Sequence, residues 1–120
     1  MIILGNTGAK RSGIKNVILS NNLLSIPDRF FANATRLEQI TIPDSVTSID
    51  EKAFYGCTSL TSITIPDSVT SIGDHAFSGC SRLTTVNYTG TKEQWNKISI
   101  SSWGNDYLRN APKNYNYTGK

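Results

Sequence analysis

The chain has 120 residues, a length that allows one domain and argues against two. Hydrophobic residues make up 38% of it and charged residues only 18%; Ser, Thr and Asn take their place, which suits an exported protein. The net charge is +3, but Lys and Arg are scattered, and no run of about 18 apolar residues is present. The composition therefore excludes a membrane span and argues against a nucleic-acid partner.

The first 15 residues contain a basic group and a short apolar run. The densest basic group, Lys10, Arg11 and Lys15, is either a solvated segment or a small phosphate-binding patch. The apolar run Met1–Leu4 is shorter than a signal-peptide core, which needs roughly 7–15 residues. The chain is therefore expected either to be cytosolic or to begin downstream of an export signal.

A repeat of 23 residues runs through the chain. Segments 40–49 and 63–72 are identical, and segments 53–57 and 76–80 nearly so. One repeat cannot bury its apolar face alone, so equivalent residues are predicted to stack into a continuous core. The predicted columns are Ile14, Leu37, Leu60 and Leu83; Val17, Ile40, Ile63 and Val86; Leu19, Ile42, Ile65 and Tyr88; Leu23, Val46 and Val69; Ile26, Ile49 and Ile72, with Ile3 before them and Trp95 after; and Phe31, Phe54 and Phe77.

In chain order, a single domain is predicted, with a partial coil over residues 1–13, repeats over 14–85, and a terminal repeat with a cap over 86–120. Within a repeat, the alternation in 63–65 predicts a strand, 66–68 a turn, and 69–72 a second extended segment. Stacked strands are expected to pair in parallel about 4.8 Å apart. Residues 74–79 predict about one helical turn ending at Gly79. An acid opens that turn in each coil, where it suits the helix dipole, at Asp28, Glu51 and Asp74.

The segment from Leu60 to Cys80 reads Leu-x-x-Ile-x-Ile-Pro-Asp-Ser-Val-Thr-Ser-Ile-Gly-Asp-His-Ala-Phe-Ser-Gly-Cys and resembles the BspA-type leucine-rich repeat. The 23-residue period, the Ile-Pro turn, the Ala-Phe pair and the Gly-Cys pair are features of that family, and Tyr88–Ile98 resembles its terminal repeat. The resemblance covers about residues 14–117. It departs at Leu19–Ile26, which lacks the Pro turn, and at Ala34, which replaces the Cys.

The resemblance implies an α/β-type solenoid, with a parallel β-sheet on one face, short helical turns or irregular coil on the other, and an aromatic C-terminal cap. Members of this family are commonly at the cell surface or secreted. Several act as adhesins, and the family carries no catalytic residues to transfer. It also implies that Cys57 and Cys80 stack as buried thiols.

The residues that could take part in catalysis, metal binding or disulfide formation have structural explanations in the repeat. Stacking brings Cys57 and Cys80 within reach of a disulfide, although their side chains should point the same way, so free thiols and a disulfide both remain open. His75 shares its column with Arg29 and Lys52 and is expected to face solvent. The paired acids Asp44 and Asp67, and Glu51 and Asp74, fall at turn and helix-start positions. We therefore predict no catalytic residues, no metal site and no cofactor.

The solvent face of the predicted sheet is the candidate binding surface, because solenoids bind on such extended faces. The alternative is that its Thr and Ser residues only favour β structure. The candidate residues are Asn16, Ile18, Gln39, Thr41, Ser62, Thr64, Thr85 and Asn87.

Aromatic residues gather near the C-terminus. They predict a cap over the last coil, with a ligand-binding aromatic platform, for example for a sugar, as the alternative. They are Tyr88, Trp95, Trp103, Tyr107, Tyr115 and Tyr117.

The sequence thus predicts a non-catalytic binding or adhesion module for a protein or glycan partner. The alternative is a structural spacer and C-terminal cap fragment of a longer surface solenoid. The repeat pattern of this chain starts part-way through a coil, which leaves the N-terminal end open and predicts a homodimer through residues 1–26.

Overall fold

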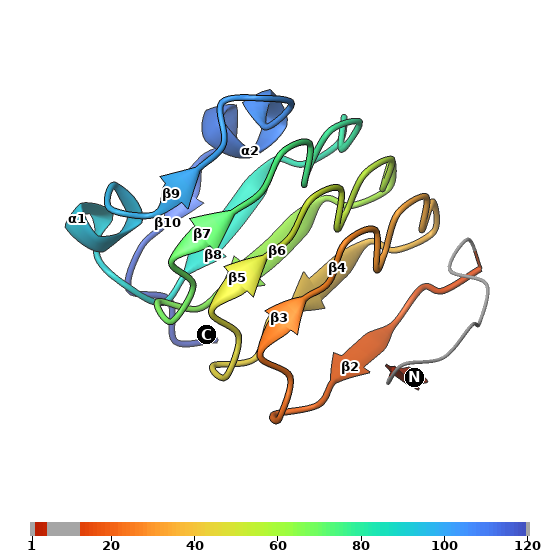
Figure 1. Cartoon of the computed structure of the whole chain (residues 1–120), viewed down its shortest axis with the longest axis horizontal. Coiled ribbons are helices and arrows are strands. Elements are labelled where there is room, and N and C mark those ends of the chain that lie inside the picture. The colour runs from red at the N-terminus through yellow and green to blue at the C-terminus, as the bar shows by residue number, and fades with distance from the viewer. Residues whose placement is uncertain (1, 5–12, 120) are drawn as a thin grey trace.

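The computed structural model describes residues 2–4 and 13–119, the first three as backbone. They form a parallel β-solenoid of about four turns with few helices (Figure 1). The elements, in chain order, are β1 Ile2–Leu4, β2 Val17–Leu19, β3 Ser25–Ile26, β4 Gln39–Thr41, β5 Ser48–Ile49, β6 Ser62–Ile65, β7 Ser71–Ile72, β8 Thr85–Tyr88, α1 Lys92–Trp95, β9 Ser99–Ile100, α2 Asp106–Asn110 and β10 Lys113–Asn114.

Two sides of the solenoid are parallel sheets. The first has the strand order β10-β8-β6-β4, with the β1-β2 pair at its N-terminal end, and the second has the order β3-β5-β7-β9 (Figure 1). Successive coils pair with the 23-residue register, as Ile40 with Ile63 and Ile49 with Ile72 show. The predicted parallel stacking of the repeats is therefore confirmed.

The register predicted for both ends of the solenoid is wrong. Ile3 pairs with Ile18, so it does not precede Ile26 in the fifth column. At the other end Ile72 pairs with Ile100, and Trp95 lies in α1 instead. At this C-terminal end the reason is that helix α1 is inserted into the last coil and lengthens it, so the 23-residue spacing no longer applies there.

The third side is a stack of turns, which we call the turn ladder: residues 28–34, 51–57 and 74–80. The helical turn predicted for residues 74–79 is absent, and hydrogen-bonded turns replace it. Each coil donates backbone N–H groups to the next, for example from Phe31 to Ala53 (2.8 Å) and from Phe54 to Ala76 (2.8 Å). These inter-coil bonds use the backbone groups that a helix would pair internally. The dipole argument for the acids therefore does not apply.

Left-handed backbone explains why the turn ladder is not helical. Lys52 and His75 have φ values of 57° and 56°, and Gly56 and Gly79 have φ values of 74° and 80°. Glycine adopts these angles without strain, because it lacks a Cβ. Two left-handed residues in each turn break the α-helical path and direct the N–H groups along the solenoid axis.

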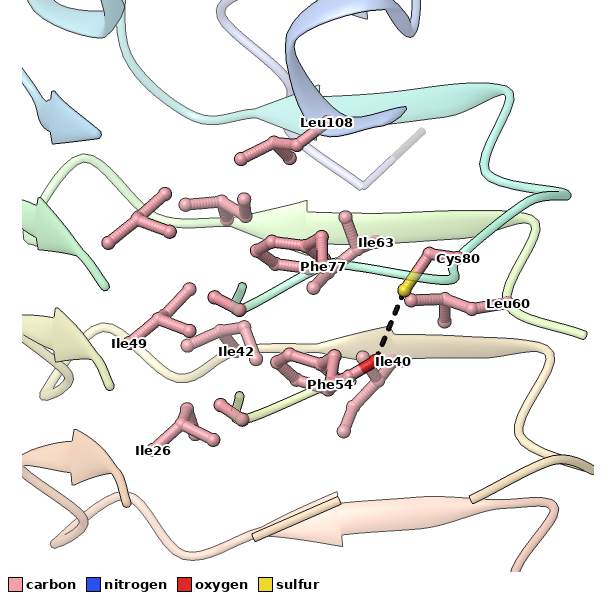
Figure 2. Close-up of a cluster of buried hydrophobic side chains, with 14 of the residues drawn as sticks. Ile26, Ile40, Ile42, Ile49, Phe54, Leu60, Ile63, Phe77, Cys80 and Leu108 are labelled. Atoms are coloured by element: carbon pink, nitrogen blue, oxygen red, sulfur yellow. Dashed lines mark hydrogen bonds between the residues drawn. The ribbon is translucent and has the colours of Figure 1, made fainter. Parts of the chain in front are cut away.

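The apolar columns fill the space between the three sides. The phenyl rings of Phe31, Phe54 and Phe77 are fully buried and stack with centroids 5.3 and 5.2 Å apart. Figure 2 shows Phe54 and Phe77 in this stack, with Leu108 of α2 beyond Phe77. The predicted core columns are confirmed except at the two ends named above and at Val17 and Leu23, which are only partly buried.

Both cysteines are free, buried thiols, as the family resemblance implied. Cys57 donates its S–H to the carbonyl of Phe31 (3.1 Å), and Cys80 donates to that of Phe54 (3.2 Å; Figure 2). The neighbouring Cys57 thiol, together with burial, raises the pKa of Cys80 well above its usual range. A thiol that stays protonated is a poor nucleophile and a poor metal ligand.

Candidate functional site

The candidate site is the outer face of the first sheet, where alternate residues of β2, β4, β6 and β8 point away from the core. Along β6, for example, Ile63 and Ile65 are buried while Ser62 and Thr64 are half-buried. This alternation follows from the period of two in a strand. None of the eight predicted residues is buried, and Ile18 is 45% exposed.

A hollow of about 600 Å³ lies on this face, and we call it the sheet-face hollow. Seven of the eight predicted residues line it, and Thr85 does not. The seven are Asn16, Ile18, Gln39, Thr41, Ser62, Thr64 and Asn87. The structure therefore gathers nearly all of the predicted surface into one concave site spanning four coils.

Asn21, Pro43 and Tyr117 also line the hollow, and sequence reasoning did not place them there. Asn21 and Pro43 are each the second residue after a strand, β2 and β4, so the turns at the strand ends could have indicated them. Tyr117 comes from the C-terminal segment. Its N–H donates to the carbonyl of Tyr88 (2.9 Å), and the N–H of Asn116 donates to that of Gly90 (2.8 Å). No repeat equivalence predicts this pairing.

Hydroxyl groups elsewhere on the solenoid are used to join the coils. Ser45 and Ser68 donate to the carbonyls of Leu23 (2.6 Å) and Val46 (2.7 Å), and Thr70 donates to that of Thr47 (3.2 Å). In the described part of the chain, the side chains of Thr41 and Thr64 have no such partner. Their hydroxyl groups are therefore available to a ligand in the hollow.

The sheet-face hollow ends at a pair of amides. The side chain of Asn114 in β10 donates to that of Asn87 in β8 (2.9 Å), which orients the Asn87 carboxamide. At the N-terminal end, Lys15 and Glu38 form an exposed ion pair (3.7 Å) next to the lining residues Asn16 and Gln39. Lys10 and Arg11, the other members of the predicted basic group, lie outside the described residues.

His75 is less exposed than the sequence predicts. The backbone N–H of His75 donates to the carbonyl of Trp103 (2.7 Å). The imidazole ring packs so closely on Gly104 that a Cβ at position 104 would collide with it. The half-buried ring therefore belongs to the turn ladder and the last coil, and it lies outside the sheet-face hollow.

The acids Glu51 and Asp74 lie in the turn ladder, away from the hollow. Glu51 and Asp74 accept inter-coil hydrogen bonds at their backbone carbonyls, from Arg29 and Lys52. Asp28 and Glu51 line a shallower depression of about 330 Å³ beside the second sheet. Within residues 13–119, no three His, Cys, Asp or Glu side chains are grouped so that they could hold a metal ion.

The last coil contains the polar core residue that sequence reasoning missed. Asn105 is fully buried and accepts the N–H of Phe77 at Oδ1 (3.1 Å). Its Nδ2 donates to the carbonyls of Gly73 (3.1 Å) and Ser101 (3.0 Å). In the repeats, the N–H of Phe54 donates to the backbone carbonyl of Ala76 in the next coil. For Phe77, the side-chain Oδ1 of Asn105 takes the place of that carbonyl.

The family description "BspA type Leucine rich repeat region (6 copies)" matches residues 4–113. The chain belongs to the BspA-type leucine-rich repeat family. No curated protein sequence matches it. Its strands and their register agree with this assignment, since each coil contributes one strand to each parallel sheet.

Two solved structures are similar to the chain. A leucine-rich cell surface protein from Faecalibacterium prausnitzii is 39% identical, with a TM-score of 0.71 over 74% of this chain and 24% of that protein. A leucine-rich repeat protein from Bacteroides ovatus is 30% identical, with a TM-score of 0.67 over 87% of this chain and 25% of that protein. The chain thus spans about a quarter of the length of either protein.

No helix in the part of the chain that the structure describes is long and apolar enough to cross a membrane.

Proposed function

We propose that this BspA-type chain is a non-catalytic binding module that acts at the cell surface or after secretion, and that its sheet-face hollow receives a protein or glycan partner. The observation that carries the proposal is the hollow itself, which gathers seven outward-facing residues from four successive coils. The surface location is supported by the similar Faecalibacterium protein, which is a cell surface protein. Extended faces of this kind are where solenoids bind their partners.

The test is a screen of the purified chain against protein and glycan arrays. The double variant Thr41→Arg/Thr64→Arg fills the hollow with charge and bulk, and both positions point to solvent, so the fold should be retained. Thr58→Arg, at an exposed position directly after the turn ladder and outside the hollow, is the matched control. We expect a ligand that binds the native chain and the control but not the double variant. Equal binding by all three proteins would contradict the proposal.

A second role, as the spacer and C-terminal cap of a longer surface solenoid, is favoured by the aromatic packing at the C-terminal end. The Tyr88 ring is buried and meets Trp95 edge-on (5.1 Å) and Tyr115 edge-on (6.4 Å). Lys113 donates to the carbonyls of Leu108 (2.8 Å) and Arg109 (2.6 Å) and lies 5.4 Å from the centroid of the Trp95 ring. We propose that residues 86–120 act as this cap.

The cap role is tested by Trp95→Ala. Removing the indole uncovers the Tyr88 side of the core, so we expect concentration-dependent association in sedimentation velocity. Trp103→Ala, at an indole that is 68% exposed, is the control and should leave the sedimentation unchanged. A Trp95→Ala protein that remains monomeric at all concentrations would exclude a capping role for this residue.

The N-terminal side of the first sheet is the proposed site of self-association. Among the described residues, β1 pairs only with β2, so it forms the outer edge of the sheet. An edge strand is a template for pairing with a second copy. Part of the predicted dimer segment, residues 1 and 5–12, lies outside the described residues. Ile3→Pro removes one backbone donor from β1, and we expect it to reduce any dimer seen by light scattering.

A further inference from the structure

The sheet-face hollow is polar without being charged. Of the described residues that line it, none is an acid, a lysine, an arginine or a histidine. The lining polar groups are carboxamides and hydroxyls, which both donate and accept hydrogen bonds. A charged ligand would lose hydration there without gaining a counter-charge, which is costly. The hollow is therefore suited to a neutral ligand that carries many hydroxyl groups.

The lining polar groups recur from coil to coil. Gln39 and Ser62 are paired neighbours in β4 and β6, and Thr64 and Asn87 are paired neighbours in β6 and β8. Parallel strands lie about 4.8 Å apart, so equivalent donors and acceptors repeat at that spacing. A ligand built from repeating units can make similar hydrogen bonds at successive coils.

An extended peptide strand is a poorer match to this face. Peptides that add to a sheet bind through main-chain hydrogen bonds at an open edge. In β6 those groups are already paired with β4 on one side and with β8 on the other. The ligand must therefore be recognised by the side chains of the hollow.

Tyr117 adds an aromatic wall to the hollow. The backbone hydrogen bonds of residues 116 and 117 to the β8 segment fix the main chain at Tyr117, so binding need not order this segment from a free state. The face of an aromatic ring is electron-rich and attracts the weakly positive C–H groups of a sugar ring. Apolar Ile18 and Pro43 line the same hollow and can pack on the C–H faces of further sugar units.

We propose that the sheet-face hollow binds a neutral oligosaccharide, with Tyr117 as the stacking platform and the side chains of Gln39, Thr64 and Asn87 as hydrogen-bonding groups. This inference rests on the proposed function and names its ligand class. It assigns a specific role to Tyr117 in a hollow that is otherwise formed by the repeats.

The test uses neutral hexasaccharides, namely a β-1,4-glucan, an α-1,4-glucan and a β-1,4-mannan, together with an array of neutral glycans. A uronate-containing hexasaccharide is the charged counter-probe. Binding is measured by calorimetry and by NMR shifts of the side-chain amides of Gln39 and Asn87. We expect at least one neutral glycan to bind and to shift both amides, and the uronate hexasaccharide not to bind.

Three variants locate the binding. Tyr117→Ala should weaken binding by roughly tenfold, as truncation of an interface tyrosine often does. Tyr117→Phe keeps the ring and should bind like the native chain. Tyr107→Ala, at an exposed aromatic residue outside the hollow, is the matched control and should also bind normally.

The outcomes separate this inference from the proposed function. If a protein ligand binds the native chain but not Thr41→Arg/Thr64→Arg while no neutral glycan binds, the sugar inference is wrong and the binding function stands. If neutral glycans bind but Tyr117→Ala binds equally well, the platform role is wrong. If no ligand of either class depends on the hollow, both proposals fail.

Discussion

The side chain of Asn105 ends the ladder of backbone hydrogen bonds that joins successive turns. Each turn of the ladder offers a carbonyl to the previous coil, and the last coil lacks an equivalent repeat to provide one. The carboxamide of Asn105 supplies the acceptor for Phe77 and uses its own N–H groups on two further carbonyls. In a fully buried position this satisfies three backbone groups at once.

Asn105→Ala is therefore expected to lower the free energy of unfolding by about 1–3 kcal/mol, because it leaves buried backbone groups without partners. Urea unfolding followed by circular dichroism measures the change. Asn110→Ala, at the exposed end of α2, is the control and should change stability by less than about 0.5 kcal/mol. Equal stability of the two variants would show that solvent satisfies the Phe77 N–H.

Tyr88 makes stability depend on pH in the alkaline range. Burial, with a smaller contribution from the negative charge of Asp67, raises the pKa of Tyr88 above the ordinary tyrosine value of about 10. Above that pH the unfolded chain releases the phenolic proton before the folded chain does. The stability is therefore complete below about pH 10 and falls as pH rises further.

Tyr88→Phe should remove part of this alkaline loss. We expect the urea midpoint of the native chain to fall more between about pH 8 and about pH 11 than that of Tyr88→Phe. Tyr107→Phe, at a residue that is 45% exposed, is the control and should follow the native chain. Parallel pH profiles for native and Tyr88→Phe proteins would exclude Tyr88 as a source of the dependence.

At the scale of elements, the phenyl stack links three turns of the ladder to the sheets. Phe54 contacts rings on both sides, so its removal leaves a cavity between two rigid neighbours. Phe54→Ala should lower the free energy of unfolding by about 3–5 kcal/mol. Tyr55→Ala, next to it but 40% exposed, should cost less than about 1 kcal/mol. Chemical unfolding of both variants tests the contrast, and similar losses would mean that the stack is not the stabilising feature.

Gly73 lies at a close approach of two coils, at the corner between the second sheet and the turn ladder. A Cβ on Gly73 would lie 2.8 Å from the backbone nitrogen of Glu51 and 3.1 Å from the carbonyl carbon of Asp50. Backbone atoms cannot move aside as a side-chain end can, so Gly73→Ala should destabilise the chain by about 1–3 kcal/mol. Gly13→Ala, where a Cβ meets nothing within 4 Å, is the control in thermal unfolding. An unchanged melting temperature for Gly73→Ala would show that the coils can separate at no cost.

For the whole molecule, charge and binding surface are predicted to be independent. The net charge of +3 comes from residues scattered over the chain, and the described lining of the sheet-face hollow carries none of it. The affinity for a neutral hexasaccharide should therefore change by less than about twofold between about 50 mM and about 500 mM NaCl, because no ion pair is screened. Calorimetry at both salt concentrations measures this. A steep loss of affinity with salt would point to a charged ligand group and to a binding site outside the hollow.

The sequence by itself determined the repeating part of this protein: the period, the core columns and the outward-facing residues of the sheet. It could do so because equivalent residues in a stacked repeat occupy equivalent places, so a spacing of 23 residues converts directly into neighbours in space. The same register brings Cys57 and Cys80 together, whereas it left open whether they form a disulfide; their state as buried thiols was implied by the family resemblance.

Only the tertiary structure decided what happens where the repeat stops. The insertion of α1 moves Trp95 out of its predicted column, Asn105 takes over a backbone role, and the C-terminal segment returns to β8 to place Tyr117 in the hollow. Residues without an equivalent in another coil are positioned by packing and hydrogen bonds with distant parts of the chain. Contacts between coils also decide the left-handed turns that replace the predicted helical turns, because their N–H groups bond to the next coil.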